Sequence, residues 1–254
     1  MAEFSIREQI ICTAAHLMAD GSTAFVGTGI PMLAGMLAQR THAPNLVVIF
    51  EFGGTGAQLT KLPHGVGDSR TFYRAVAASG ICDVMEAAQR GFVEYGFLGA
   101  AQIDMYGNLN TTVIGNYWPP KVRLPGSGGA NDIGSNCWKV ISIMGQHTSK
   151  VFVKKLDFLT TPGYLSGPGA REAAGLAPNC GPYRVVSNLG IMGYDEQSKR
   201  MTLLETYAGI PVEEVLKNTE FEMLVAPDVR TASAPSALEL KFLREDIDPD
   251  KLYR

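Results

Sequence analysis

The amino-acid sequence predicts a single open α/β domain over residues 1–254, with a mostly parallel sheet flanked by helices. The first observation is the order of elements between residues 5 and 51, namely helix, strand, glycine turn, helix and strand. This alternation is typical of a parallel sheet, because parallel strands need a crossover connection that is usually a helix. The second observation is composition, since 46% hydrophobic and 19% charged residues provide a core and a polar surface. No internal repeat or obvious linker divides the chain, which favours one domain.

Helix caps and glycines predict the first elements. Ser5 and Glu8 have the spacing of a capping box, so a helix is predicted to begin beside Ser5 and to end by Gly21. Proline is favoured at the first position of a helix, and Pro31 therefore predicts a second helix up to about residue 40. Short buried strands are predicted at 23–26 and 46–51.

The later elements follow from apolar periodicity and turn residues. Helices are predicted at 83–90, 211–218 and 235–246, and a hairpin joins 101–104 to 109–114. Two loops rich in glycine and proline, 125–134 and 161–182, are predicted to be functional, as long ordered loops usually are. Further strands are predicted at 92–98, 140–144, 151–159, 183–187, 201–206 and 221–225.

Charge, apolar run length and cysteine spacing exclude several classes of function. A formal net charge of −3 provides no basic surface for nucleic acid. No apolar stretch approaches the roughly 18 to 20 residues that span a membrane, and the first five residues lack the layout of a signal peptide. We therefore expect a cytoplasmic protein without a disulfide framework or metal site, because the cysteines are scattered and the histidines isolated. The cysteines are Cys12, Cys82, Cys137 and Cys180.

Glu51 is the candidate catalytic residue. It follows the apolar run 46–50 and precedes Gly53 and Gly54. Ligands collect at the carboxyl ends of strands in open α/β sheets, and glycines let a substrate approach the backbone closely. No histidine, cysteine or second acid lies nearby in the sequence, so this carboxylate is interpreted as a nucleophile rather than as half of an acid–base pair.

The turn formed by Gly27, Thr28 and Gly29 has three interpretations. It lies between a strand and a helix, and the N–H groups of a helix N-terminus suit a carboxylate, a phosphate or a developing oxyanion. A plain tight turn is equally consistent with the residues. The third interpretation is a dinucleotide site, in which Glu51, about 22 residues after Gly29, would bind a ribose hydroxyl, although the turn is not GxGxxG.

Two other groups are candidates for anion binding. The segment 125–132 is predicted to lack regular structure, and its amides at Gly128, Gly129, Ala130 and Asn131 would form a concave anion site; a mobile surface loop is the alternative. Arg70 and Arg74 are spaced i, i+4 and would share one face of a helix, where they would bind a carboxylate or phosphate. A solvated basic face paired with Asp68 is the favoured alternative.

Taken together, these segments resemble the β (B) subunit of the class I CoA-transferases, particularly the glutaconate CoA-transferase type. The most specific segments are AQIDMYGNLN at 101–110 and GSGGAND at 126–132. Matching blocks follow in order from residue 27 to residue 249 and cover nearly the whole chain. The others are 27–31, Glu51, 66–68, 161–163, 167–172 and 243–249.

The resemblance implies an enzyme that moves CoA between carboxylic acids by ping-pong chemistry on a glutamate, and Glu51 matches the position of that nucleophile. Residues 27–29 and 128–130 match the backbone donors of the site, and Arg70 and Arg74 become candidate contacts for CoA phosphates or a substrate carboxylate. The resemblance also implies an α-type subunit of the same fold as partner. Acyl-CoA is the expected cofactor-like substrate, and no metal is expected.

Two alternatives stay open at this point. Some relatives of this fold act as ring-opening CoA-ester hydrolases or as decarboxylases, in which Glu51 would act as a base or not at all. In the second alternative the chain is a non-catalytic ligand-binding or scaffolding subunit, and Glu51 is structural. Glu51 is followed by Phe52, Gly53 and Gly54, and the Glu-Asn-Gly of the ketoacid branch is absent, so substrates of that branch are not expected.

Overall fold

The computed structural model describes residues 3–254; Met1 and Ala2, with which the predicted domain begins, lie outside the described residues. The chain divides into two compact units. Unit 1 comprises the described residues up to Phe97 together with Ser233–Arg254, and unit 2 comprises Leu98–Ala232. That residues 1–254 form one domain stays a prediction.

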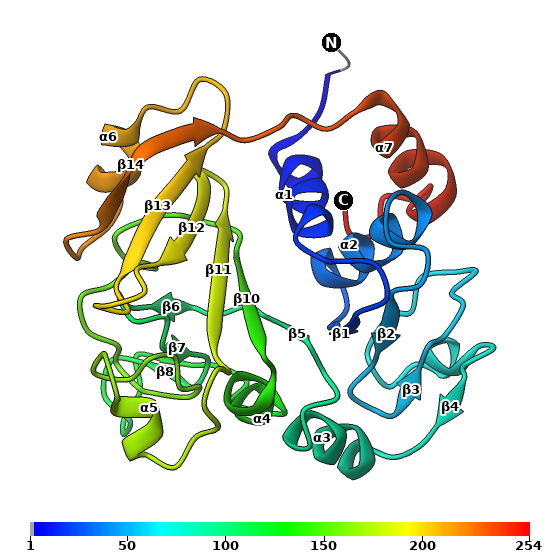
Figure 1. The fold of residues 1–254 in the computed structure, drawn as a ribbon, viewed down its shortest axis with the longest axis horizontal. Helices are drawn as coiled ribbons and strands as arrows, with labels where there is room; N and C mark the ends of the chain where they lie inside the picture. The colour runs from blue at the N-terminus through cyan, green and yellow to red at the C-terminus, as the bar shows by residue number, and fades with distance from the viewer. Residues whose placement is uncertain (1–2) are drawn as a thin grey trace. The chain divides into compact units, whose positions relative to one another are not determined.

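Unit 1 contains helices packed beside a small sheet (Figure 1). Helix α2 packs both on α1, near the start of the chain, and on the π-helix η2, near residue 247. Segments far apart in the sequence are thus brought together in unit 1. Its helices are α1 (Ile6–His16), α2 (Ile30–Arg40), the 3-10 helix η1 (Ser69–Phe72), α3 (Ile81–Gln89), α7 (Ala237–Lys241) and η2 (Phe242–Ile247). Its strands are β1 (Thr23–Phe25), β2 (Val47–Ile49), β3 (Gly54–Thr55), β4 (Ala77–Ala78) and β5 (Tyr95–Leu98), whose last residue belongs to unit 2.

The sheet of unit 1 has the strand order β5-β1-β2-β3-β4. Its central strands β5, β1 and β2 are parallel, whereas β3 and β4 add antiparallel pairs at the edge. In the central pair, Phe25 lies opposite Ile49. The core packed against these strands includes Ile11, Leu33 and Phe50, which are inaccessible to solvent.

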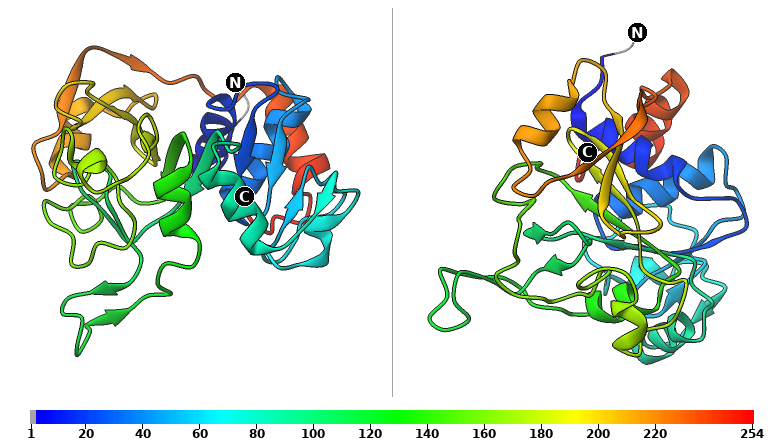
Figure 2. Two further views of the ribbon diagram at one scale, coloured as in Figure 1. Left: turned by 60° about the horizontal axis from the view of Figure 1, so that its bottom comes forward. Right: turned by 60° about the vertical axis from the view of Figure 1, so that its left-hand side comes forward.

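Unit 2 contains the sheet order β14-β13-β12-β11-β10 and two small hairpins. The pairs β10–β11 and β13–β14 are parallel, and β12 pairs antiparallel with both of its neighbours. Figure 2 shows the hairpin of β8 and β9, in green, extending away from the rest of this unit. The elements are β6 (Gln102–Ile103), β7 (Leu109–Asn110), β8 (Val113–Ile114), β9 (Val122–Arg123), α4 (Ala130–Asn136), β10 (Lys139–Met144), α5 (Ala170–Ala173), β11 (Pro182–Ser187), β12 (Gly190–Tyr194), β13 (Met201–Thr206), α6 (Val212–Lys217) and β14 (Leu224–Thr231).

The open α/β fold with parallel central strands is as predicted, and the predicted caps are correct. Ser5 accepts a hydrogen bond from the amide of Glu8, and the Glu8 carboxylate accepts one from the amide of Ser5, so the capping box of α1 is complete. The strand predicted at 151–159 is wrong. Phe152 forms only one bridge, to Ile103, and the amide of Lys154 donates to the Glu220 carboxylate instead of to a strand.

Among residues 3–254, no helix combines the length and the apolar character that crossing a membrane requires.

Candidate active site

The carboxyl ends of β1 and β2 bring the first glycine turn and Glu51 to the same edge of the unit 1 sheet. Phe25 and Ile49 are paired in register, and Gly27 and Glu51 each follow one member of this pair by two residues. The amide of Val26 still donates to the carbonyl of Ile49 at 3.0 Å, so the two chains run together up to this edge. Carboxyl edges of parallel strands are the usual ligand sites of open α/β sheets. The structure therefore places two of the predicted site groups as neighbours.

Glu51 lies at the tip of a tight turn between β2 and β3. The amide of Gly53 donates to the carbonyl of Phe50 at 2.9 Å, and the amide of Phe50 donates to the carbonyl of Gly54 at 2.9 Å. Phe50 is fully buried and Glu51 is half-buried, so the turn presents the carboxylate from a rigid, packed base. A side chain on an ordered turn keeps its orientation more closely than one on a free loop.

The glycines that follow Glu51 serve the packing of the chain itself. Gly53 has φ +113°, and a Cβ there would collide with the carbonyl of Ser79. A Cβ at Gly54 would likewise collide with the carbonyl of Thr71. The close approach expected at these glycines is thus made by the backbone of Ser79 and Thr71, which packs against the turn that carries Glu51.

The glycine turn before α2 has the geometry of a helix N-terminus without a side-chain cap. Gly29 is the N-cap of the 11-residue helix α2 and has φ +87°, and Pro31 lies in its first turn. The amide of Leu33 donates to the carbonyl of Gly29 at 3.1 Å, which closes the first helical turn. A Cβ at Gly27 would meet no atom of the described residues within 4 Å. Space above the turn and amides at the helix N-terminus suit a bound anion or oxyanion.

Arg70 and Arg74 do not share a helical face. The helix η1 ends at Phe72, and Arg74 has φ +49°, a left-handed conformation that interrupts any helix. Arg70 donates to the carbonyl of Leu62 at 2.6 Å, and its Nε lies 3.6 Å from the Asp68 carboxylate. Arg70 is thus paired with Asp68, as the favoured alternative from the sequence predicts. Together with Lys61, Arg70 also lines a cavity of about 300 Å³.

In unit 2, residues 125–132 are predicted to lack regular structure, and this prediction is wrong for residues 130–132. Helix α4 begins at Ala130, and Gly129 is its N-cap. Glycine disfavours a helix, and α4 begins at Ala130, directly after the pair Gly128 and Gly129. The Ala130 amide donates to the carbonyl of Ser127 at 2.9 Å, and the Asn131 amide donates to the Ser127 hydroxyl at 3.2 Å. The Asn131 side chain donates to the carbonyl of Thr160, so it anchors the helix.

The segment 101–110 forms a turn that hydrogen-bonds to the loop containing Gly163. Asp104 accepts hydrogen bonds from the amides of Tyr106 and Asn108, as expected of a residue that caps the turn, and burial raises the pKa of its carboxyl. Asn108 Oδ1 accepts from the amides of Gly163 and Leu165 at 2.7 and 3.0 Å. A Cβ at Gly163 would collide with the backbone of this turn, so the two glycine-containing segments interlock.

Arg171 is hydrogen-bonded to the backbone of α4. Its side chain is 2% exposed and donates to the carbonyls of Gly134 and Ser135 in α4 and of Pro162 and Gly163 in the adjoining loop. Burial lowers the pKa of this guanidinium. Carbonyls at the end of a helix carry partial negative charge and solvate the buried cation. Arg171 is therefore a structural residue.

The contacts of His147 give this histidine a structural role. Buried His147 contacts the hydroxyls of Ser187 and Thr219, each at 2.9 Å, and stacks on Phe152. Burial lowers the pKa of His147 to about 3, so the ring is neutral near pH 7. No group of three or more potential metal ligands occurs among residues 3–254. The expected absence of a metal stays a prediction.

Tyr253 is a neighbour of the glycine turn that the sequence did not reveal. Its ring carbon Cδ1 lies 3.9 Å from the position that a Cβ of Gly29 would occupy. More than two hundred residues separate the two positions in the chain, and neither periodicity nor a motif signals their contact.

Comparison with known proteins gives a consistent family. Residues 7–218 match the family model described as Coenzyme A transferase. The chain is 37% identical to the β (B) subunit of glutaconate CoA-transferase from Acidaminococcus fermentans, over 98% of this chain and 95% of that protein. The crystal structure of the Acidaminococcus enzyme superposes with a TM-score of 0.94 at 35% identity, covering 99% and 97% of the two chains.

Two other relatives widen the range. The chain is 38% identical to the β (B) subunit of 3-oxoadipate CoA-transferase from Pseudomonas knackmussii, over 96% of this chain and 94% of that protein. It is 28% identical to the IpdB chain of the cholesterol ring-cleaving hydrolase from Rhodococcus jostii, over 88% and 83%.

Proposed function

The chain belongs to the coenzyme A transferase family, as its motifs predicted, and we propose that it is the β subunit of a heteromeric CoA-transferase with Glu51 as covalent nucleophile. The observation that carries this proposal is the position of Glu51. Its carboxylate stands on a packed turn at the carboxyl edge of the sheet, beside the uncapped N-terminus of α2. A nucleophile and backbone donors at one edge are the two groups that acyl transfer requires.

The proposed reaction proceeds in two half-reactions. In the first, a Glu51 oxygen bonds to the acyl carbonyl carbon, the C–S bond breaks, and an acyl–glutamyl anhydride and CoA thiolate result. The thiolate then attacks the glutamyl carbonyl, which releases the first carboxylic acid and leaves a glutamyl-CoA thioester. A second carboxylate repeats these steps in reverse and leaves as its CoA ester. The CoA thiolate that leaves in the first step is the nucleophile of the second, and the first acid leaves as its carboxylate, so no external reductant or oxidant enters the balance.

The backbone at Gly27, Thr28 and Gly29 is the proposed donor set of unit 1 for the oxyanion of each tetrahedral intermediate. Loss of one such donor costs other enzymes about two to three orders of magnitude in rate. In unit 2, Gly128 and Gly129 remain proposed contacts of the substrate, while the amides of Ala130 and Asn131 already donate to Ser127. Arg70 is retained as a candidate contact for a CoA phosphate, since it lines a cavity. Arg74 is a weaker candidate.

The partner is proposed to be an α-type CoA-transferase subunit. Both transferase relatives are B subunits of their enzymes, which supports a heteromer. The acids in these two names, glutaconate and 3-oxoadipate, are dicarboxylic acids, so we propose a short dicarboxylate as the acceptor of CoA. The cytoplasm is the proposed location, because all four cysteines are unpaired, which fits a reducing compartment.

The decisive experiment traps the intermediate. The chain is co-expressed with the α-type subunit, incubated with a dicarboxylyl-CoA donor, treated with borohydride and analysed by peptide mass spectrometry. Reduction of the Glu51 thioester to an alcohol, with release of CoA thiol, is expected, together with loss of turnover in Glu51→Ala. In Glu51→Asp, which withdraws the carboxylate by one methylene, turnover should fall about a hundredfold. Glu86→Ala is the matched control, since this exposed carboxylate of unit 1 pairs only with Arg90 on the surface.

Two other outcomes would replace the proposal. The similarity to a chain of a ring-cleaving hydrolase favours hydrolysis as the second candidate, and release of free CoA without any acceptor acid, with no adduct, would identify it. Full turnover in Glu51→Ala within the complex would make this chain a non-catalytic, ligand-binding or scaffolding subunit.

A further inference from the structure

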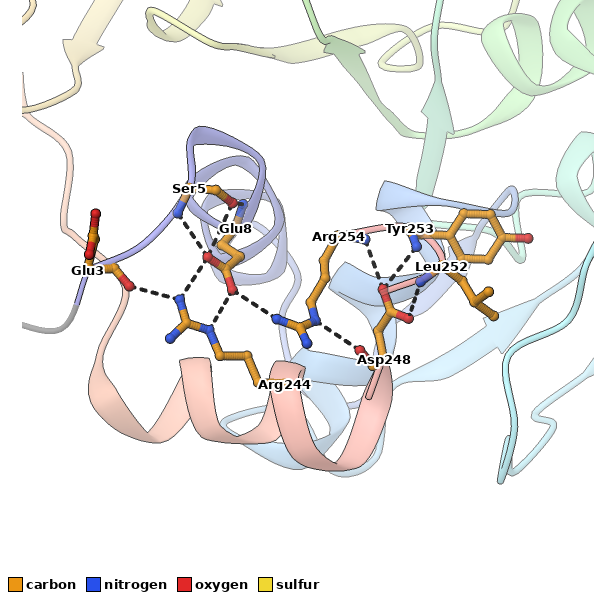
Figure 3. Close-up of polar contacts among 8 residues, drawn as sticks. All are labelled: Glu3, Ser5, Glu8, Arg244, Asp248, Leu252, Tyr253 and Arg254. Carbon is orange, nitrogen blue, oxygen red and sulfur yellow. Dashed lines mark hydrogen bonds and ion pairs between the residues drawn. The ribbon is translucent and has the colours of Figure 1, made fainter. Parts of the chain in front are cut away.

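The segment Asp248–Arg254 folds back on itself around one buried carboxylate (Figure 3). Asp248 is fully inaccessible to solvent. Its side chain accepts hydrogen bonds from the amides of Leu252, Tyr253 and Arg254 at 2.7, 2.9 and 2.8 Å. In addition, Arg254 Nε donates a hydrogen bond to the carbonyl of Asp248 at 2.8 Å. Several charge-assisted bonds to one residue fix the path of the segment.

A second buried carboxylate connects this segment to α1. Glu8 accepts two bonds from Arg244, at 2.7 and 2.9 Å, and Arg254 Nη1 lies 3.5 Å from Glu8 Oε1. Figure 3 shows the Glu8 carboxylate between the two guanidinium groups. The Glu8 side chain is 5% and that of Arg254 10% exposed, so this pair is shielded from solvent. The segment is therefore held at two points.

Between these anchors, the Tyr253 side chain reaches the glycine turn. Its hydroxyl donates to the carbonyl of Pro63 at 2.9 Å, and its ring carbon Cδ1 lies 3.9 Å from the position that a Cβ of Gly29 would occupy. Among the described residues, no atom other than Cδ1 of Tyr253 lies within 4 Å of the Cβ position at Gly29, chain neighbours aside. The ring thus lies beside Gly29, which has φ +87° and no side chain of its own. Because glycine has wide backbone freedom, a neighbouring ring limits where this part of the turn can move.

We propose that Tyr253 is a positioning residue of the active site, which holds the Gly29 backbone, and with it the amides at the start of α2, in the orientation that stabilises the oxyanion. Donors aimed at a developing charge are effective only when their orientation is set before the reaction, and a displacement of about 1 Å can cost roughly a hundredfold in rate. Asp248 acts one step further away, because it determines where Tyr253 lies.

The test uses the complex with the α-type subunit and three variants. Tyr253→Leu removes the ring, Tyr253→Phe keeps the ring and removes the bond to Pro63, and Asp248→Asn replaces an acceptor of three amides by a group that is half donor. Lys251→Asn is the matched control, because it changes an exposed side chain of the same segment and asparagine tolerates the φ of +56° there. Steady-state kinetics and hydrogen exchange of the Leu33 amide, which is bonded to Gly29, are measured for each.

In Tyr253→Leu, we expect kcat to fall about tenfold or more while KM for acyl-CoA changes less than about twofold, because the donors act mainly in the transition state. The Leu33 amide should exchange faster in the absence of substrate. Asp248→Asn should reproduce both effects, Tyr253→Phe should recover most of kcat, and the control should match the unmodified protein.

Several results would overturn the inference. These are an unchanged kcat in Tyr253→Leu, a change confined to KM, a loss of kcat without faster exchange at Leu33, or a Phe variant as impaired as the Leu variant. The kinetic arm rests on the proposed function, whereas the exchange arm does not. If Glu51→Ala retained turnover, the proposed function would fail, and the exchange measurements would still decide whether Tyr253 orders the turn.

Discussion

The ion pair of Glu8 provides the sharpest prediction for stability. Hydrogen bonds from Arg244 lower the pKa of the Glu8 carboxyl from 4.5 to about 2. Glu8→Gln removes the charge but keeps the capping box, because glutamine at the third helical position also accepts the N-cap amide. The variant therefore isolates the electrostatic part of the contact with Arg244 and Arg254.

The magnitude follows from linkage. A carboxyl whose pKa is lower in the folded state stabilises it at pH values above the unfolded pKa, and this contribution is lost as pH falls toward the folded pKa. With 4.5 unfolded and about 2 folded, Glu8 contributes at most about 3.4 kcal/mol near pH 7 and roughly 1.4 kcal/mol near pH 3. Residual bonds to the neutral amide reduce the loss, so we expect Glu8→Gln to cost about 2 to 3 kcal/mol near pH 7.

The assay is urea unfolding followed by far-ultraviolet circular dichroism, because the longest helices, α1 and α2, lie in unit 1 with Glu8. Tryptophan fluorescence is less suitable, since Trp118 and Trp138 both lie in unit 2. Glu86→Gln is the control, because its exposed pair with Arg90 should contribute less than about 0.5 kcal/mol at any pH. A cost for Glu8→Gln that stays constant between pH 7 and about pH 3 would refute the electrostatic account.

Three further predictions concern buried structure. Arg171→Lys should lower the free energy of unfolding by about 3 kcal/mol, because an ammonium cannot reach all four carbonyls, whereas Arg90→Lys should change it by less than about 0.5 kcal/mol; equal costs in chemical denaturation would contradict this. Gly53→Ala should cost at least about 2 kcal/mol more than Gly21→Ala, since both have positive φ but only Gly53 would place its Cβ against backbone; thermal unfolding that ranks them equally would exclude the collision. His147 should destabilise the fold as pH falls below about 6.5, because the unfolded ring protonates there while the buried ring, with a pKa of about 3, stays neutral; His147→Gln should remove that slope, and an unchanged slope would assign it to other groups.

Elements marked by local chemistry were predictable from the sequence. The capping box at Ser5, the proline at the start of α2 and the strand–glycine–helix order around residue 27 all appear as expected. So does the position of Glu51 after a buried strand. The strand predicted at 151–159 failed because a local pattern competes with distant partners. Phe152 and Val153 are buried, yet their neighbour Lys154 bonds to Glu220 rather than to a strand.

The amino-acid sequence by itself determined where α1 and α2 begin, that Glu51 follows a buried strand and which family the chain belongs to, because caps, turns and motifs act over a few neighbouring residues. Only the tertiary structure decided that Gly27 and Glu51 share one edge, that Arg171 supports α4 and that the Tyr253 ring lies near Gly29. Contacts of this kind join residues far apart in the chain. They depend on strand register and packing, which no short stretch of sequence specifies.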